Sequence, residues 1–203
     1  MPKCKICKTK FEPRFFLQKA CFNPACLDAW SKLDRLNKKD ATKKVQDIAF
    51  KAQRKKDKHR LKELMSRGKW FVRLQILINQ WVVHVRDKDK GCYTCGNTNP
   101  NIKYDCGHRH HAGSGGGDRR RFILENLHKQ CSVKCNQHGS GMPVEYDIAL
   151  DVEYGEGFSD KLRCIVNYPE LKEQFATWQD IELEIKRYRV LLRAEGLTPI
   201  SRG

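Results

Sequence analysis

The chain has 203 residues, of which 39% are hydrophobic and 32% charged, and its formal net charge is +16. This composition excludes a wholly disordered chain, and no apolar run reaches the roughly 18 to 20 residues that a membrane span needs. The N-terminal residues also lack the apolar core of a signal peptide, so we expect a cytoplasmic protein. The positive charge makes a polyanion the first partner to consider, although solubility alone is the simpler explanation.

The first segment, residues 1–27, contains four of the ten cysteines. They form two close pairs: Cys4 with Cys7, and Cys21 with Cys26. In a reducing compartment such pairs more often bind metal than form disulfides, and zinc takes four thiolates tetrahedrally. We therefore predict an N-terminal zinc knuckle that folds together with its metal. The alternative is a set of unpaired structural cysteines.

Residues 28–69 contain one glycine and no proline, and their apolar residues recur at three- and four-residue steps. This pattern predicts a long, basic helical arm, either continuous or broken. Its most basic run includes Arg54, Lys55 and Lys56, which we expect to contact DNA phosphates. A charge run of this kind is otherwise a solvated helix face.

Residues 70–140 are predicted to form the central module. A helix over 70–88 precedes a second set of cysteines, which lie at Cys92, Cys95, Cys131 and Cys135. Residues 102–105 alternate as a short strand does, and a second strand is expected over 122–131, with a helix beginning near Cys135. The glycine-rich stretch 112–117 lacks the Lys-Ser/Thr ending of a nucleotide-binding loop. After it come three candidate phosphate contacts, Arg119, Arg120 and Arg121.

A strand, a loop, a second strand and a helix, with a histidine ending the first strand, is the geometry of ββα-metal nucleases of the HNH type. His108 is the candidate general base, because an imidazole can be neutral and poised near pH 7. Asn126 is the candidate that orients it, and His128 is expected to touch the scissile phosphate or the metal. The candidate ligands of a catalytic Mg²⁺ or Mn²⁺ are Asp105, Asn136 and His138. A closed four-cysteine zinc site would be structural and would leave no position for substrate.

The last segment, residues 141–203, is predicted to be a mainly helical scaffold. A helix is expected over 177–195, capped by Thr177 and ended by Gly196.

The motifs D-C-G-H-R and E-N-L-H-K-Q-C-S-V-K-C-N-Q-H resemble the core of the phage NinG (Rap) recombination proteins. The resemblance extends to the N-terminal cysteines and the basic arm, and it covers the last third only loosely. It implies an endonuclease that acts on branched recombination intermediates such as Holliday junctions. By this resemblance His108, Asn126 and Asn136 take the three positions of the HNH pattern. Three residues separate Cys131 from Cys135 where two are usual, so Cys106 is an alternative fourth zinc ligand.

We therefore predict an α+β fold: a zinc-stapled ββα-metal core, an N-terminal zinc knuckle, a long basic helix and C-terminal helices. The predicted function is Mg²⁺- or Mn²⁺-dependent cleavage of branched DNA, with two structural zinc ions. The alternatives are a non-catalytic protein that holds branched DNA or recruits phage recombination partners, and a phage structural or RNA-binding factor. Symmetric cutting of a four-way junction needs two active sites, so we expect a homodimer.

Overall fold

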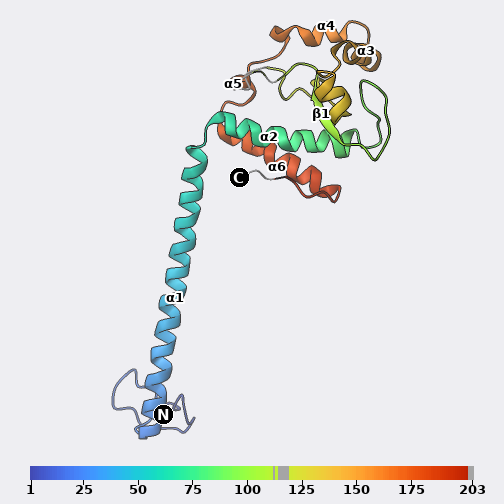
Figure 1. The fold of residues 1–203 in the computed structure, drawn as a ribbon. Helices are drawn as coiled ribbons and strands as arrows, with labels where there is room; N and C mark the ends of the chain where they lie inside the picture. The colour runs from blue at the N-terminus through green and yellow to red at the C-terminus, as the bar shows by residue number, and fades with distance from the viewer. Residues whose placement is uncertain (112, 114–118, 201–203) are drawn as a thin grey trace. The chain divides into compact units, whose positions relative to one another are not determined.

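The computed structural model describes residues 1–111, 113 and 119–200. The chain divides into two compact units, Met1–Leu64 and Met65–Gly203. The described helices, helical turns and strands (Figure 1) are α1 (Pro24–Glu63), α2 (Arg67–Trp81), η1 (Val82–Arg86), β1 (Tyr104–His108), η2 (Leu124–Asn126), β2 (Leu127–Cys131), η3 (Ser132–His138), α3 (Pro143–Tyr154), α4 (Phe158–Arg163), η4 (Ile165–Asn167), α5 (Leu171–Gln174) and α6 (Trp178–Ala194). This helix-rich arrangement with one small sheet confirms the α+β class.

The first unit consists of the cysteine-bearing loops and the predicted long helix, α1. The helix begins at Pro24, earlier than expected, because the side chain of Asn23 caps it by accepting a hydrogen bond from the Ala25 backbone. Proline in the first turn suits a helix start, since its missing N–H would have no intrahelical partner. The helix ends at Glu63 rather than running to residue 69, and Cys26 is its one buried residue.

The core of the second unit is built on α2 and α6, which pack side by side (Figure 1). Leu74 and Ile78 of α2 share this buried core with Ile181 and Ile185 of α6. The predicted helix over 70–88 divides into α2 and the π-helical turn η1. The predicted C-terminal helix is confirmed in α6, where Thr177 forms the capping box.

The sheet has two antiparallel strands, β1 and β2, with Tyr104 opposite Cys131 and His108 opposite Leu127. The prediction that the second strand starts at residue 122 was wrong. Phe122 instead packs on Phe71, with ring centroids 5.4 Å apart, and η2 turns the chain before β2 begins. The helical segment after β2 starts at Ser132, earlier than expected.

Except for Gly113, the glycine-rich stretch 112–117 lies outside the described residues. Among the helices that the structure does describe, none is long and apolar enough to cross a membrane. The finer division of the chain into four parts, 1–27, 28–69, 70–140 and 141–203, is not tested by the two compact units and stays a prediction.

Candidate metal centres and the histidine strand

The first cysteine cluster brings together the thiols of Cys4, Cys7, Cys21 and Cys26, whose sulfur atoms all lie within 4.8 Å of one another. The Sγ atoms of Cys7 and Cys21 are 3.8 Å apart. Four thiolates around zinc at about 2.3 Å would stand roughly 3.8 Å from one another, so the spacing fits this metal. The backbone N–H of Cys21 also donates to Sγ of Cys4 at 3.4 Å, a bond that favours the thiolate.

The second cluster consists of Cys92, Cys95, Cys131 and Cys135 and meets the same 4.8 Å limit. The Sγ atoms of Cys95 and Cys131 are 3.7 Å apart, and the Cys131 N–H donates to Sγ of Cys92 at 3.2 Å. Cys106, the alternative fourth ligand, lies instead in the apolar core of the second unit. This alternative is therefore excluded, and Cys135 completes the set of four, as predicted.

The thiols of the second cluster differ in how readily they lose a proton. Burial would raise the pKa of the Cys92 thiol, but hydrogen bonds from Thr94 and from backbone N–H groups outweigh it and lower that pKa to about 6. Burial and the neighbouring thiols raise the pKa of Cys135 to about 11. Four thiolates at this spacing would repel one another, and a bound cation would remove that repulsion. Both clusters are compatible with structural zinc.

The second cluster is tied to the sheet by its backbone. The knuckle turn closes through the Gly96 N–H, which donates to the Cys92 carbonyl at 2.8 Å, and Gly96 has the positive φ of 67° that glycine tolerates. The Tyr93 N–H donates to the Lys129 carbonyl on β2 at 2.8 Å. Because Cys131 is the last residue of β2, the cysteines hold the knuckle, β2 and η3 together.

His108 is the last residue of β1 and is half-buried. The segment after η3 returns to this point, since a Cβ placed on Gly141 would lie 4.0 Å from the His108 carbonyl oxygen. Just before His108, a Cβ on Gly107 would lie 1.8 Å from Oε1 of Gln130. A larger residue at position 107 would therefore displace the buried side chain of Gln130.

Asn126 is fully buried, and its described hydrogen bonds go to backbone groups. Its Oδ1 accepts from the His110 N–H at 2.8 Å, and its Nδ2 donates to the His110 carbonyl at 2.9 Å and to the Arg120 carbonyl at 3.2 Å. The side chain thus fixes the segment that follows β1. The predicted bond from Asn126 to the ring of His108 is not among these contacts, so the role is corrected to that of a backbone clamp.

Asp105 does not fit the predicted catalytic metal site. It lies three residues before His108 in one strand, so the two side chains point to opposite faces of the sheet. Its carboxylate accepts a hydrogen bond from Ser132 and lies 3.1 Å from Nζ of Lys103. Asp105 is therefore a structural link between β1 and η3.

His128 is also placed differently from the prediction. Its ring is 1% exposed and stacks on Tyr93, with ring centroids 3.7 Å apart. Nδ1 lies 2.9 Å from the Tyr146 hydroxyl and Nε2 lies 3.3 Å from the Tyr154 hydroxyl. Burial, followed by the nearby charge of Arg86, lowers the pKa of His128 to about 3. The ring is neutral and enclosed, so it has no accessible nitrogen for a phosphate or a metal.

The remaining candidates of the nuclease site lie on η3. Asn136 is half-buried and His138 is exposed, and both follow Cys135 of the second cluster. Their role as ligands of a catalytic metal stays a prediction.

Two of the three consecutive arginines are buried and cannot contact a phosphate. Arg119 pairs with Glu170 at 3.0 Å, and the buried Arg120 donates to the Leu162 and Arg163 carbonyls. Arg121 is buried too, with its guanidinium carbon 5.4 Å from the ring centroid of Phe122. Their charges are used within the second unit, and this prediction was wrong for Arg120 and Arg121. Three exposed residues of α1, here called the basic cluster, remain open to solvent: Arg54, Lys55 and Lys56.

Sequence reasoning missed two polar residues that organise this region, the buried Tyr146 and the half-buried Arg86. The hydroxyl of Tyr146, on α3, lies within 3.4 Å of the carbonyl oxygens of Gly107 and Asn126, besides its contact with His128. Arg86, on η1, donates to the Leu124 and Leu127 carbonyls. A lone tyrosine or arginine carries no motif, so no local signal identifies either of them.

The cysteine geometry and the sheet define an α+β protein with two four-thiolate sites compatible with structural zinc. Residues 1–195 match the family model described as bacteriophage lambda NinG protein, and the chain belongs to this NinG family. It is similar to Protein ninG of Escherichia phage 933W, 32% identical over 167 residues that cover 79% of each chain. Protein ninG of Escherichia phage lambda is 34% identical over 99 residues, 49% of this chain and 46% of that protein. No solved structure matches the chain.

Proposed function

We propose that the protein is a metal-dependent endonuclease that cleaves branched DNA, such as Holliday junctions, in phage recombination. One observation carries the proposal: the β1, β2 and η3 elements follow one another in the ββα-metal order, with His108 at the end of the first strand. The four-cysteine cluster joins β2 to η3 and so fixes the position of the helical turn relative to the sheet. This is the arrangement in which a strand-end histidine can activate water.

In this proposal His108 acts as the general base that takes a proton from the attacking water. The hydrogen bonds between the Asn126 side chain and the His110 backbone hold the segment that follows His108 in place. Asn136 and His138 are the residues that would hold a Mg²⁺ or Mn²⁺ ion, with water completing its coordination, and Asp105 does not take part. Such an ion, when bound, stabilises negative charge on the phosphate and the leaving oxygen.

DNA is the expected substrate because the chain carries a net charge of +16 and the basic cluster on α1 is exposed. Contacts from lysine and arginine to phosphates carry no base information, so selection of a branched substrate would rest on shape and charge. A pair of active sites would come from a homodimer.

The test is cleavage of a labelled four-way junction and a matched linear duplex, with and without Mg²⁺ or Mn²⁺. The wild type, His108→Ala and a control, His84→Ala, are compared; His84 is exposed in the same unit. We expect metal-dependent junction cleavage that only His108→Ala abolishes, by at least about 100-fold, while all three bind the junction equally. Equal cleavage by wild type and His108→Ala would refute the assignment of the base.

A second candidate function is binding of branched DNA without cleavage. The enclosed ring of His128 and the engaged carboxylate of Asp105 favour it, because they remove two of the predicted site residues from the reaction. Tight junction binding by all three proteins, with no cleavage in either metal, would identify this function. Preference for RNA over branched DNA in the same binding assay would identify an RNA-binding factor instead.

A further inference from the structure

Helix α3 presents an unusual surface for so basic a protein. Its twelve residues include four acidic side chains and no lysine or arginine. Three apolar side chains, Val144, Ile148 and Val152, recur every fourth residue and are 66%, 59% and 82% exposed. They form a single stripe along the helix, here called the α3 stripe. An apolar stripe of this kind on a helix surface marks an interaction site.

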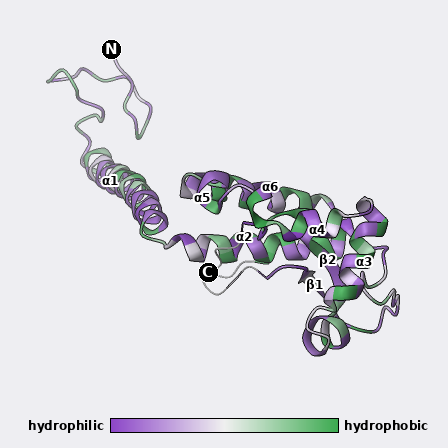
Figure 2. Cartoon of the chain, turned by 90° about the horizontal axis from the view of Figure 1, so that it is seen from above, coloured by the Kyte–Doolittle hydropathy of each residue, from purple (hydrophilic) through white to green (hydrophobic). Residues whose placement is uncertain are grey.

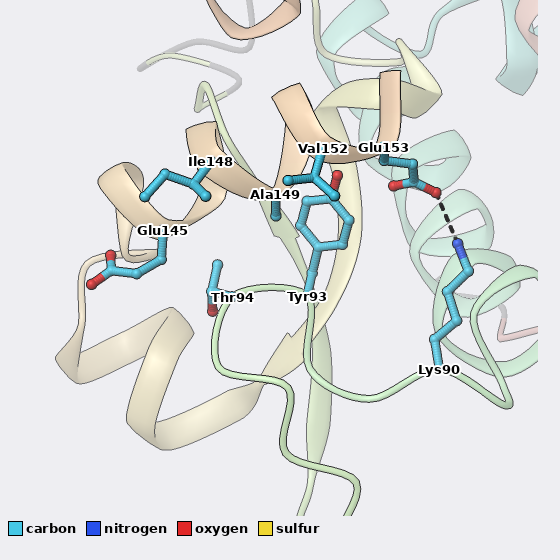
Figure 3. Close-up of a pocket in the computed structure, with 8 residues that line it drawn as sticks. All are labelled: Lys90, Tyr93, Thr94, Glu145, Ile148, Ala149, Val152 and Glu153. Carbon is cyan, nitrogen blue, oxygen red and sulfur yellow. Dashed lines mark hydrogen bonds and ion pairs between the residues drawn. The ribbon is translucent and has the colours of Figure 1, made fainter. Parts of the chain in front are cut away.

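A shallow pocket of about 490 Å³ extends the stripe toward the second zinc knuckle (Figure 3). Tyr93 and Thr94 of the knuckle form its floor beside Ile148 and Val152 of α3, and Glu145 stands at one end. At the other end Lys90 is already paired with Glu153 at 3.0 Å. The pocket is therefore apolar in the middle and retains an unneutralised carboxylate at one edge.

The charge of this surface decides the class of partner. Asp147 is paired with Arg109 and Arg163, and Glu153 with Lys90, so Glu145 is the carboxylate that gives the stripe its charge. The stripe offers a phosphate backbone no lysine or arginine of its own, so nucleic acid is a poor occupant. The matching partner is an amphipathic helix with apolar residues at similar spacing and lysines on its flanks.

Helix α1 has this chemistry. Ala41, Val45, Ile48 and Ala52 are spaced by four, three and four residues, so they lie within one narrow stripe, here called the α1 stripe. Val45 and Ile48 are 66% and 68% exposed. Lys38 and Lys44 stand on either side of the stripe at 100° per residue, and the helix holds thirteen Lys/Arg against six Asp/Glu. Figure 2 shows hydrophobic patches along this otherwise hydrophilic helix.

We propose that the α1 stripe of one chain docks on the α3 stripe of a second copy, and that the exchange is reciprocal. Each copy then contributes one basic and one acidic helix, which closes a two-fold dimer without leaving either stripe exposed. Lys43 and Arg54 lie on the opposite side of α1 and remain available to phosphates. The proposal does not depend on cleavage, because its test is the state of association.

The test is sedimentation of the full-length, zinc-loaded protein over a wide range of concentration. Four proteins are compared: the wild type, Ile48→Asp on α1, Ile148→Asp on α3, and Val190→Asp, a control that is exposed on α6. We expect a dimer whose dissociation constant rises at least about tenfold in each of the two stripe variants and stays unchanged in the control. Circular dichroism and zinc content verify that each variant folds.

Mixing the two stripe variants separates this interface from the alternatives. A mixed pair keeps one intact contact, between the α1 stripe of the Ile148→Asp chain and the α3 stripe of the Ile48→Asp chain, so the mixture should associate more tightly than either variant alone. A wild type that stays monomeric at every concentration would overturn the proposal. So would loss of association in Ile48→Asp alone, which would indicate paired α1 helices, or in Ile148→Asp alone, which would indicate paired α3 helices.

Discussion

Protonation of His128 should couple the stability of the second unit to pH. The buried ring has a pKa lowered from 6.5 to about 3, first by burial and then by Arg86. On acidification the unfolded chain binds a proton at this histidine before the folded chain does. The stability that depends on a neutral His128 is therefore fully present above the unfolded pKa and is lost as the pH falls toward the folded pKa. The carboxylate of Glu153, 3.5 Å from Nε2, forms no ion pair while the ring is neutral.

The size of the effect follows from the two pKa values. Between about pH 7 and about pH 5.5 the folded ring stays neutral while the unfolded ring becomes mostly charged, which lowers the free energy of unfolding by about 1.2 kcal/mol. The measurements stay at or above about pH 5.5, because stronger acid would protonate the cysteine thiolates and release zinc. The exposed fraction of 1% leaves little solvent to screen the effect.

The assay is urea unfolding followed by tryptophan fluorescence. All proteins carry Trp30→Phe, so that the three remaining tryptophans report on the second unit. The comparison variant is His128→Phe, which keeps an aromatic ring against Tyr93 and cannot be protonated. We expect the variant to lack about 1.2 kcal/mol of the pH dependence measured for the parent. The same pH dependence in both proteins would refute the argument that His128 is buried and neutral.

Three further predictions follow from the described contacts. Cys135→Ser should lower the bound zinc from two ions to one per chain, while Cys106→Ser should keep both ions. Metal analysis after dialysis measures the zinc content. Equal loss of zinc in both variants would indicate that Cys106 is also a zinc ligand. Asn126→Ala removes three hydrogen bonds, two to the His110 backbone and one to the buried Arg120 carbonyl. It should destabilise the second unit by about 2 to 4 kcal/mol in the urea assay, whereas the control Asn136→Ala should change little. Replacing the three residues of the basic cluster with alanine should weaken the salt dependence of DNA binding. If all three contact phosphates, the magnitude of the slope of the logarithm of the DNA-binding constant against the logarithm of the salt concentration should fall by up to about 2.7. An unchanged slope would exclude them from the interface.

The parts of the site that the sequence could predict are those determined locally. The cysteine pairs are recognisable because a short turn places two thiolates on one ion. Seven of the eight candidate zinc ligands could therefore be predicted from spacing alone, and only the choice between Cys106 and Cys135 needed the structure. The capped helix after Thr177 was predicted for the same reason, since its cap and its apolar face are contained in one segment.

The errors arose where distant segments decide the environment. His128 is enclosed by Tyr93 from the knuckle and Tyr146 from α3, and neither contact is visible in the residues around it. Arg120 and Arg121 resemble a basic patch until the carbonyls of α4 and an aromatic ring are brought to them by folding. Asp105 is a different case, because strand alternation already places its side chain on the face opposite His108.

The distribution of charge restricts where a nucleic acid can bind each unit. The second unit is close to neutral, with 21 Lys/Arg against 17 Asp/Glu, and two of its arginines, Arg120 and Arg121, are buried. The first unit has the opposite character, with a 40-residue helix that buries only Cys26 and exposes its lysines. Affinity for DNA is therefore expected to come mainly from α1. Under the proposed function cleavage would depend on His108 in the other unit, so substitutions should separate binding from cleavage.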